Sequence, residues 1–208
     1  MSFFKPRPTQ PDMNVEVPTG WAPPLWDRPS EAIMGTPVGI SALVAKSDRV
    51  AVALGHFEAY PNGCTFQLII RGNPMAPRPS DMTHPGAMML RAGPPGMQRG
   101  PRLGLEFADG QRVVEGYGFE LMRSQDGKDD QGIPTSPVLM PRGGGGGGDH
   151  FAMRYWLFPL PPPGSMKVFI EWEDLDIPET MVELDADAIR DASSRAVLLW
   201  DSPPATAD

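Results

Sequence analysis

Six consecutive glycines, Gly143–Gly148, lie between two apolar segments in the last third of the chain. Ordering such a run is costly, because glycine loses more backbone freedom on folding than any other residue. A chain that carries it between two strands uses it as a mobile connection or as backbone that approaches another group closely. We expect residues 143–148 to form a mobile loop, with close backbone approach to a partner protein as the alternative.

Prolines and glycines also separate short apolar runs along the rest of the chain. The 208 residues include 26 prolines and 23 glycines, and hydrophobic residues make up 40%. Short apolar runs divided by turn residues are typical of strands joined by turns and loops. We therefore predict an all-β fold, an antiparallel sandwich of about seven to nine strands that is immunoglobulin-like or jelly-roll-like.

Two turn signals predict β-hairpins. Pro61-Asn62-Gly63 separates apolar runs at 49–60 and 64–71, and Asp109-Gly110 separates runs at 102–108 and 111–114. Asn, Asp and Gly accept the positive φ that tight hairpin turns require. The other predicted elements are strands at 39–45, 118–123, 138–140 and 180–184, loops at 72–100 and 124–132, and a strand or cap at 197–200.

The richest aromatic segment, 151–158, is followed by Pro159–Gly164 and a second apolar run at 167–173. We predict that these two runs are antiparallel neighbours whose rings pair across a hairpin and form much of the core. The rings concerned are Tyr155, Trp156, Phe158, Phe169 and Trp172. Farther on, Asp185 offers an N-cap for one short C-terminal helix at 186–195.

Residues 1–37 form a proline-rich N-terminal arm that carries Trp21 and Trp26. Proline lacks an N–H group and fixes φ, so this arm is not a central strand or a long helix. A wholly disordered tail rarely carries two tryptophans. We expect part of the arm to cover the core, with anchoring of a partner as the alternative. The sandwich domain then spans 38–200, and 201–208 is a disordered tail.

Charge and the chain start limit the partners. The formal net charge is −8 and the basic residues are scattered, which argues against nucleic acid because phosphate binding needs a basic stripe. Residues 1–10 lack the apolar region of a secretory signal, and no window approaches the roughly 20 apolar residues of a membrane span. These features predict a cytoplasmic protein that does not bind membranes.

No spacing of residues predicts a metal site or a cofactor. His56, His84 and His150 are far apart in the sequence, whereas zinc ligands often come in closely spaced pairs. The single cysteine, Cys64, begins a predicted strand and is expected to act as a small apolar residue. The acidic residues at 171–179 lack the residue order of a calcium loop.

Between residues 27 and 200 the chain resembles a family of β-rich bacterial proteins, mainly from high-GC genomes, to which no activity is assigned. The resemblance is carried by Ala59–Gly63 and by the segment 143–179, which contains YWLFPLPPPG, FIEW and IPET. It implies a compact β-rich domain and no catalytic residues.

The absence of catalytic spacing favours a non-enzymatic binding or structural module that contacts a protein partner. The candidate contact residues are Trp21, Trp26, Met88, Met89 and His150, since methionine-rich loops adapt to varied surfaces. The alternative is a hydrolase with a site between the loops 72–100 and 143–150, around His84, Asp149 and His150. A carbohydrate-binding module is a third possibility, which the lack of an export signal disfavours.

Overall fold

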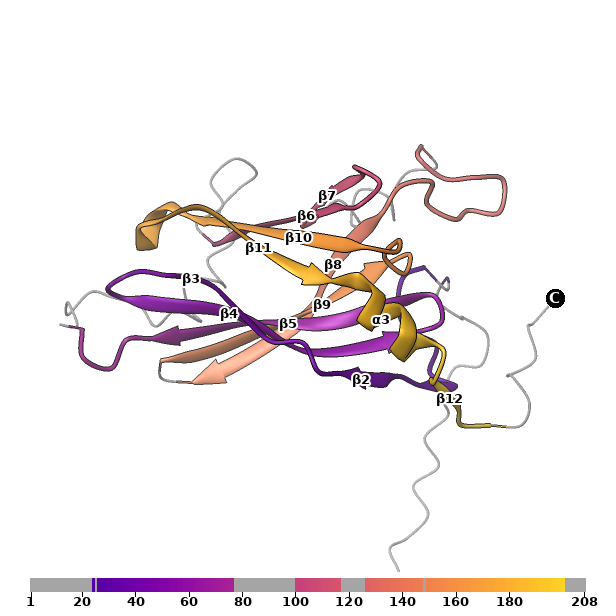
Figure 1. The fold of residues 1–208 in the computed structure, drawn as a ribbon, viewed down its shortest axis with the longest axis horizontal. Helices are drawn as coiled ribbons and strands as arrows, with labels where there is room; N and C mark the ends of the chain where they lie inside the picture. The colour runs from indigo at the N-terminus through magenta and orange to yellow at the C-terminus, as the bar shows by residue number, and fades with distance from the viewer. Residues whose placement is uncertain (1–23, 25, 77–99, 117–125, 148, 201–208) are drawn as a thin grey trace, which may run out of the picture.

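The computed structural model describes residues 24, 26–76, 100–116, 126–147 and 149–200. Within these residues, two antiparallel sheets face each other and form an all-β sandwich with one short helix (Figure 1). The predicted fold class is therefore confirmed, although the described part holds twelve strands, more than the sequence suggested.

The larger sheet has the order β2-β4-β5-β9-β8, with β3 also paired to β4, so β8 forms one of its edges. Its strands are β2 (Thr36–Val38), β3 (Ala42–Lys46), β4 (Val50–Tyr60), β5 (Gly63–Gly72), β8 (Val138–Gly147) and β9 (His150–Phe158). The segment predicted as an arm already contains strands, β2 and the short β1 (Ile33–Met34).

The second sheet has the order β11-β10-β6-β7. Its strands are β6 (Arg102–Phe107), β7 (Arg112–Val114), β10 (Ser165–Trp172) and β11 (Ile177–Asp185), with a 3-10 turn η1 (Glu173–Leu175) between the last two. A separate two-stranded sheet pairs β1 with β12 (Val197–Leu198).

Both predicted hairpins are confirmed. Strands β4 and β5 pair from Tyr60 and Gly63 outward, and β6 and β7 pair on either side of Asp109-Gly110. Gly110 has φ of 84°, the left-handed conformation for which this turn selects glycine. The predicted helix is also present as α3 (Ala186–Ser193), and the Asp185 carboxylate accepts a hydrogen bond from the Asp187 N–H at 2.9 Å.

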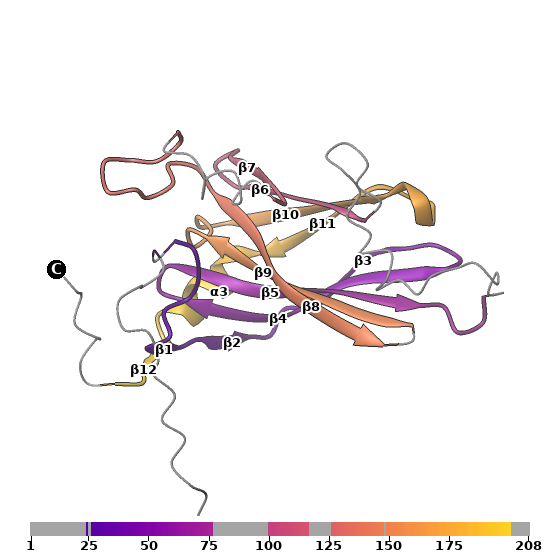
Figure 2. The ribbon, with the colours of Figure 1, turned by 180° about the vertical axis from the view of Figure 1, so that it is seen from behind.

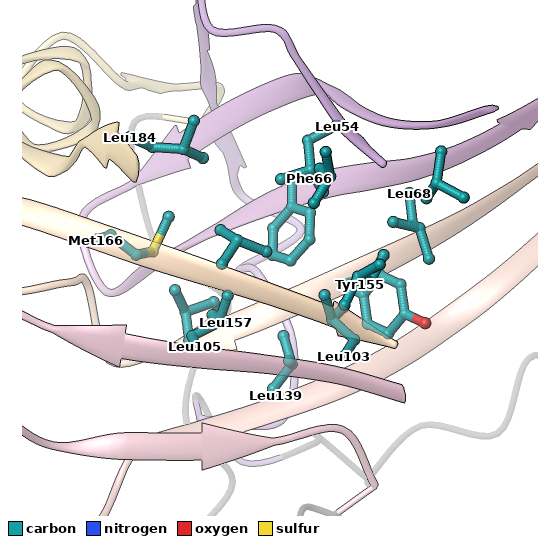
Figure 3. Packing of buried hydrophobic residues seen from close by; sticks show 14 of the residues in the cluster. Leu54, Phe66, Leu68, Leu103, Leu105, Leu139, Tyr155, Leu157, Met166 and Leu184 are labelled. Carbon is teal, nitrogen blue, oxygen red and sulfur yellow. The ribbon is translucent and has the colours of Figure 1, made fainter. Parts of the chain in front are cut away.

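The core lies between the two sheets, where alternate residues of every long strand point inward (Figure 3). The Phe66 ring stacks on Tyr155 with centroids 5.5 Å apart and on Phe57 at 5.2 Å. Met166, Val168, Ile170 and Trp172 of β10 face these rings from the other sheet, and Ile189 of α3 is also fully buried.

The prediction that residues 151–158 and 167–173 are neighbouring strands is wrong. Strand β9 pairs with β5 and β8, whereas β10 pairs with β6 and β11 in the opposite sheet. Both edges of β9 are thus occupied. The connection, Pro159–Gly164, contains four prolines, which lack the N–H groups of a tight hairpin turn and favour an extended crossing between layers.

The prediction of a mobile glycine loop is also wrong for the described residues. Gly143–Gly147 continue strand β8, and Gly144–Gly147 pair with residues 150–153 of β9. Glycine is needed here because the two backbones come close: a Cβ on Gly144 would lie 2.6 Å from the Ala152 carbonyl oxygen. The backbone that lies close to the glycines is therefore β9 of the same chain, and pairing with β9 orders the glycine run.

Candidate protein-binding edge

The residues that the sequence nominated for partner contact do not form one surface among the described residues. Trp26 is 4% exposed, and His150 is half-buried at the start of β9. Trp21, Met88, Met89 and the proposed catalytic His84 lie outside the described residues, as do the predicted strand 118–123 and tail 201–208. Of the nominated set, His150 alone is described and accessible.

Trp26 is part of a second, smaller core on the outer face of the larger sheet. The Trp156 indole donates a hydrogen bond from Nε1 to the Trp26 carbonyl oxygen at 2.8 Å, and Tyr60, Val138 and Met140 complete the cluster of buried residues. The ammonium group of Lys128 lies 5.3 Å from the centre of the Trp26 ring. The arm therefore covers the sheet through Trp26, as one of the two sequence hypotheses expected.

Beside this cluster, an ion pair is buried. The Asp27 side chain is fully buried and receives hydrogen bonds from Arg142 Nη2 at 2.6 Å and Arg28 Nε at 3.1 Å. The pair fixes the start of the described chain to β8 at Arg142, the residue that precedes the glycine run.

Strand β8 has two dissimilar halves. The first half is protected: Gly116 donates its N–H to the Leu139 carbonyl oxygen at 3.3 Å, and a bulge follows Pro141. Prolines and bulges are devices that natural proteins use to block sheet edges. The second half, Gly144–Gly147, follows the bulge and contains no proline, and it is exposed along its length at the rim of the sheet (Figures 1 and 2).

The glycine half has an unpaired side among the described residues, since β9 is its one strand neighbour there. An antiparallel neighbour uses only every second N–H and C=O group of a strand. The remaining backbone groups of Gly144–Gly147 point away from β9. On the outer face, no atom lies within 4 Å of the position that a Cβ of Gly145 or Gly147 would take. This arrangement is the template for adding a further strand.

On the outer face beside this edge, one row of the sheet carries mainly small residues. Ala152 lies opposite Gly145, Ile69 opposite Ala152, and Ala53 opposite Ile69, in one row across four strands. The next row, toward the β8–β9 turn, places His150 opposite Gly147 and Arg71 opposite His150. Sequence reasoning missed Arg71 and Arg154, because neither belongs to a motif; the pairing register brings them beside the glycines.

A second surface lies on the outer face of the smaller sheet. A shallow depression of about 270 Å³ forms over Gly104, between Phe169 and Val114 of the adjacent strands. Ion pairs flank it, Arg102 with Glu171 at 2.5 Å and Lys167 with Glu106 at 2.9 Å. These charged side chains pair with one another, so they are not available to bind a ligand.

A third surface is an apolar patch on the β1–β12 sheet. Its members are exposed by about half of their area or more: Met34, Val197, Leu198, Leu199 and Trp200. Patches of this kind often mark contact surfaces. Its members carry no charge, and nothing among the described residues indicates what covers it.

The titratable groups in the core do not form a catalytic arrangement within the described part of the chain. Burial raises the pKa of the Cys64 thiol to about 12, so the reactive thiolate is suppressed. Burial also raises the pKa of Glu115 to about 7, and its interaction with Tyr155 opposes the shift. The Tyr155 hydroxyl has no well-formed hydrogen bond to a described residue, and burial and Glu115 raise its pKa.

Metal-binding clusters of three or more His, Cys, Asp or Glu side chains are not found among the described residues. In that same part of the chain, no helix has the length and apolarity needed to cross a membrane. Comparisons with protein-family models, with curated proteins and with solved structures found no match.

Proposed function

We propose that this protein is a non-enzymatic binding module that accepts an extended segment of a partner protein at the glycine edge of β8. The observation that carries the proposal is the exposed, side-chain-free half-strand Gly143–Gly147 at the rim of an otherwise well-packed sheet. Backbone hydrogen bonds would supply affinity, and the neighbouring face of β9 would supply selectivity. His150, nominated from the sequence, lies at the end of this edge.

The rigid scaffold supports this role. Strand β9 is fixed between β5 and β8, and its Tyr155, Trp156 and Leu157 are fully buried. The glycine strand is therefore held in place before any partner arrives. Preorganisation of this kind reduces the entropy lost on binding.

The hydrolase alternative gains no support from the described residues. Asp149 and His150 lie at the β8–β9 turn, and the Asp149 carbonyl oxygen accepts a hydrogen bond from the Gly72 N–H at 2.6 Å. The turn is used to join strands, and no second candidate function is favoured by a specific observation.

Panning a displayed library of random nonapeptides against the folded protein tests the proposal. We expect enrichment of proline-free sequences with high β-propensity. Proline is then placed at Gly144, Gly145, Gly146 and Gly147 in turn. Alanine is the matched control at Gly145 and Gly147, where a Cβ meets no atom within 4 Å, whereas at Gly144 and Gly146 it would collide with carbonyl oxygens of β9. Among the variants that circular dichroism shows to be folded, proline abolishes peptide binding wherever it removes an outward-facing N–H, and alanine at Gly145 and Gly147 retains binding. Enriched peptides that bind every folded proline variant equally would contradict the proposal.

A further inference from the structure

The outer face beside the glycine edge presents positive charge although the whole chain has a net charge of −8. His150 and Arg71 are cross-strand neighbours on this face, and the same row continues through Ala51 to Lys46 of β3. Arg154 stands four residues beyond His150 along β9, on the same side of the sheet. Arg71, Arg154 and Lys46 are exposed and His150 is half-buried.

These basic groups are not neutralised within the described part of the chain. The ion pairs and side-chain hydrogen bonds found there do not involve Lys46, Arg71, His150 or Arg154. Along these strands the nearest carboxylates lie at the ends of the face: Asp149 at the turn before His150, Asp48 at the turn after Lys46, and Glu58 opposite Thr65. On the opposite sheet, by contrast, Arg102 and Arg112 are both paired with glutamates.

The glycines allow these charges to reach a docked strand. Neighbouring strands lie about 4.8 Å apart, so a strand added to β8 would stand about 10 Å from β9. No side chain of Gly143–Gly147 fills the intervening space. An arginine on β9 and a glutamate on the added strand, both long, can therefore meet above the glycines.

Resting on the proposed function, we propose that the segment accepted at this edge is acidic, with carboxylates on the side that faces Arg154, His150 and Arg71. Alternation along a strand places such carboxylates at every second residue. Apolar residues at the positions between them would continue the inner face, next to the buried Phe151. A nucleic acid offers negative charge but lacks the backbone groups that pair with a sheet edge, and the acidic chain as a whole repels it.

Three matched nonapeptides test the inference, in which valine alternates with glutamate, glutamine or lysine. Fluorescence anisotropy at low salt measures binding to the full-length protein. We expect the glutamate peptide to bind about tenfold more tightly than the glutamine peptide, and its advantage to shrink at high salt. The lysine peptide should bind most weakly.

Charge reversal identifies the residues involved. Arg154→Glu should lower affinity for the glutamate peptide several-fold, and Arg71→Glu, one strand farther from the added strand, should lower it by less; both should leave the glutamine peptide unchanged. Arg195→Glu, at the end of α3, is the matched control and should change neither. Because these side chains are exposed, the variants should fold, as circular dichroism can check.

The outcomes separate the two proposals. Equal binding of the glutamate and glutamine peptides overturns the inference and leaves the proposed function standing. Failure of all three peptides to bind overturns both. A single-stranded oligonucleotide that binds tightly and competes for Arg154 and Arg71 would show that nucleic acid is the ligand of this face and would also overturn the inference.

Discussion

Trp156 donates its indole N–H to the backbone carbonyl of Trp26, 130 residues earlier in the chain and 2.8 Å away. Both rings are buried on the outer face of the larger sheet, where neighbouring Tyr155 points into the opposite, inter-sheet core. Strand β9 thus organises two cores at once. Because β9 is buried on both faces, it is a fixed neighbour for the glycines of β8 that pair with it.

Trp26→Ala should destabilise the protein by about 3–5 kcal/mol, the usual cost of truncating a buried tryptophan. Trp200→Ala is the matched control, because Trp200 is 63% exposed and its loss should cost less than about 0.5 kcal/mol. Urea unfolding gives both values. Equal and small effects would indicate that the Trp26 ring is not buried in solution.

The buried Asp27–Arg142 pair should matter far more than the exposed Arg102–Glu171 pair, although their N–O distances are nearly equal at 2.6 and 2.5 Å. Asp27→Ala leaves Arg142 with an uncompensated charge and should cost about 3 kcal/mol or more. Glu171→Ala should cost about 1 kcal/mol or less. Similar losses of unfolding free energy for the two variants would contradict this ranking.

Glycine substitutions should distinguish the two sides of β8. A Cβ on Gly144 would collide with the Ala152 carbonyl oxygen, whereas a Cβ on Gly145 meets no atom within 4 Å. Gly144→Ala should therefore destabilise the fold by about 1 kcal/mol or more. Gly145→Ala should be neutral or stabilise it by up to about 1 kcal/mol, since alanine restricts the unfolded chain. A mobile loop would instead tolerate both substitutions alike.

Glu115 should make the protein less stable as the pH rises. Its folded pKa of about 7 lies above the ordinary 4.5, so the folded state binds the proton more tightly. The stability gained from that proton is complete below about pH 4.5 and is lost as the pH rises through 7. Glu115→Gln should match the wild type near pH 4.5 and exceed its unfolding free energy by about 1–3 kcal/mol at pH 8. Parallel pH profiles of the two proteins would contradict the assignment.

Local signals in the sequence predicted the local structure. Asn62-Gly63, Asp109-Gly110 and the Asp185 cap each act within a few residues, and the elements that they define are present. The pairing of β9 was not predictable in this way. Its neighbours are chosen by burial on both of its faces, which depends on Phe66 and Trp26 far away in the sequence.

The structure of the glycine run was also not predictable from local signals in the sequence. Intrinsic preference favours a loop, but pairing with β9 overrides it, because β9 is immobilised and holds Gly144–Gly147 alongside its residues 150–153. The basic groups of the outer face were also invisible in the sequence. Arg71 and Arg154 are 83 positions apart and share one face only through the β5–β9 register, which places Arg71 opposite His150 and Arg154 opposite Gln67.

The most direct test is the nuclear magnetic resonance of glycine-¹⁵N-labelled protein titrated with the glutamate–valine peptide, combined with amide exchange. The account predicts that alternate amides within Gly143–Gly147 shift and become protected, whereas glycines on the other sheet, such as Gly104 and Gly110, stay unchanged. Saturable peptide binding that leaves the amides of Gly143–Gly147 unshifted and unprotected would contradict it.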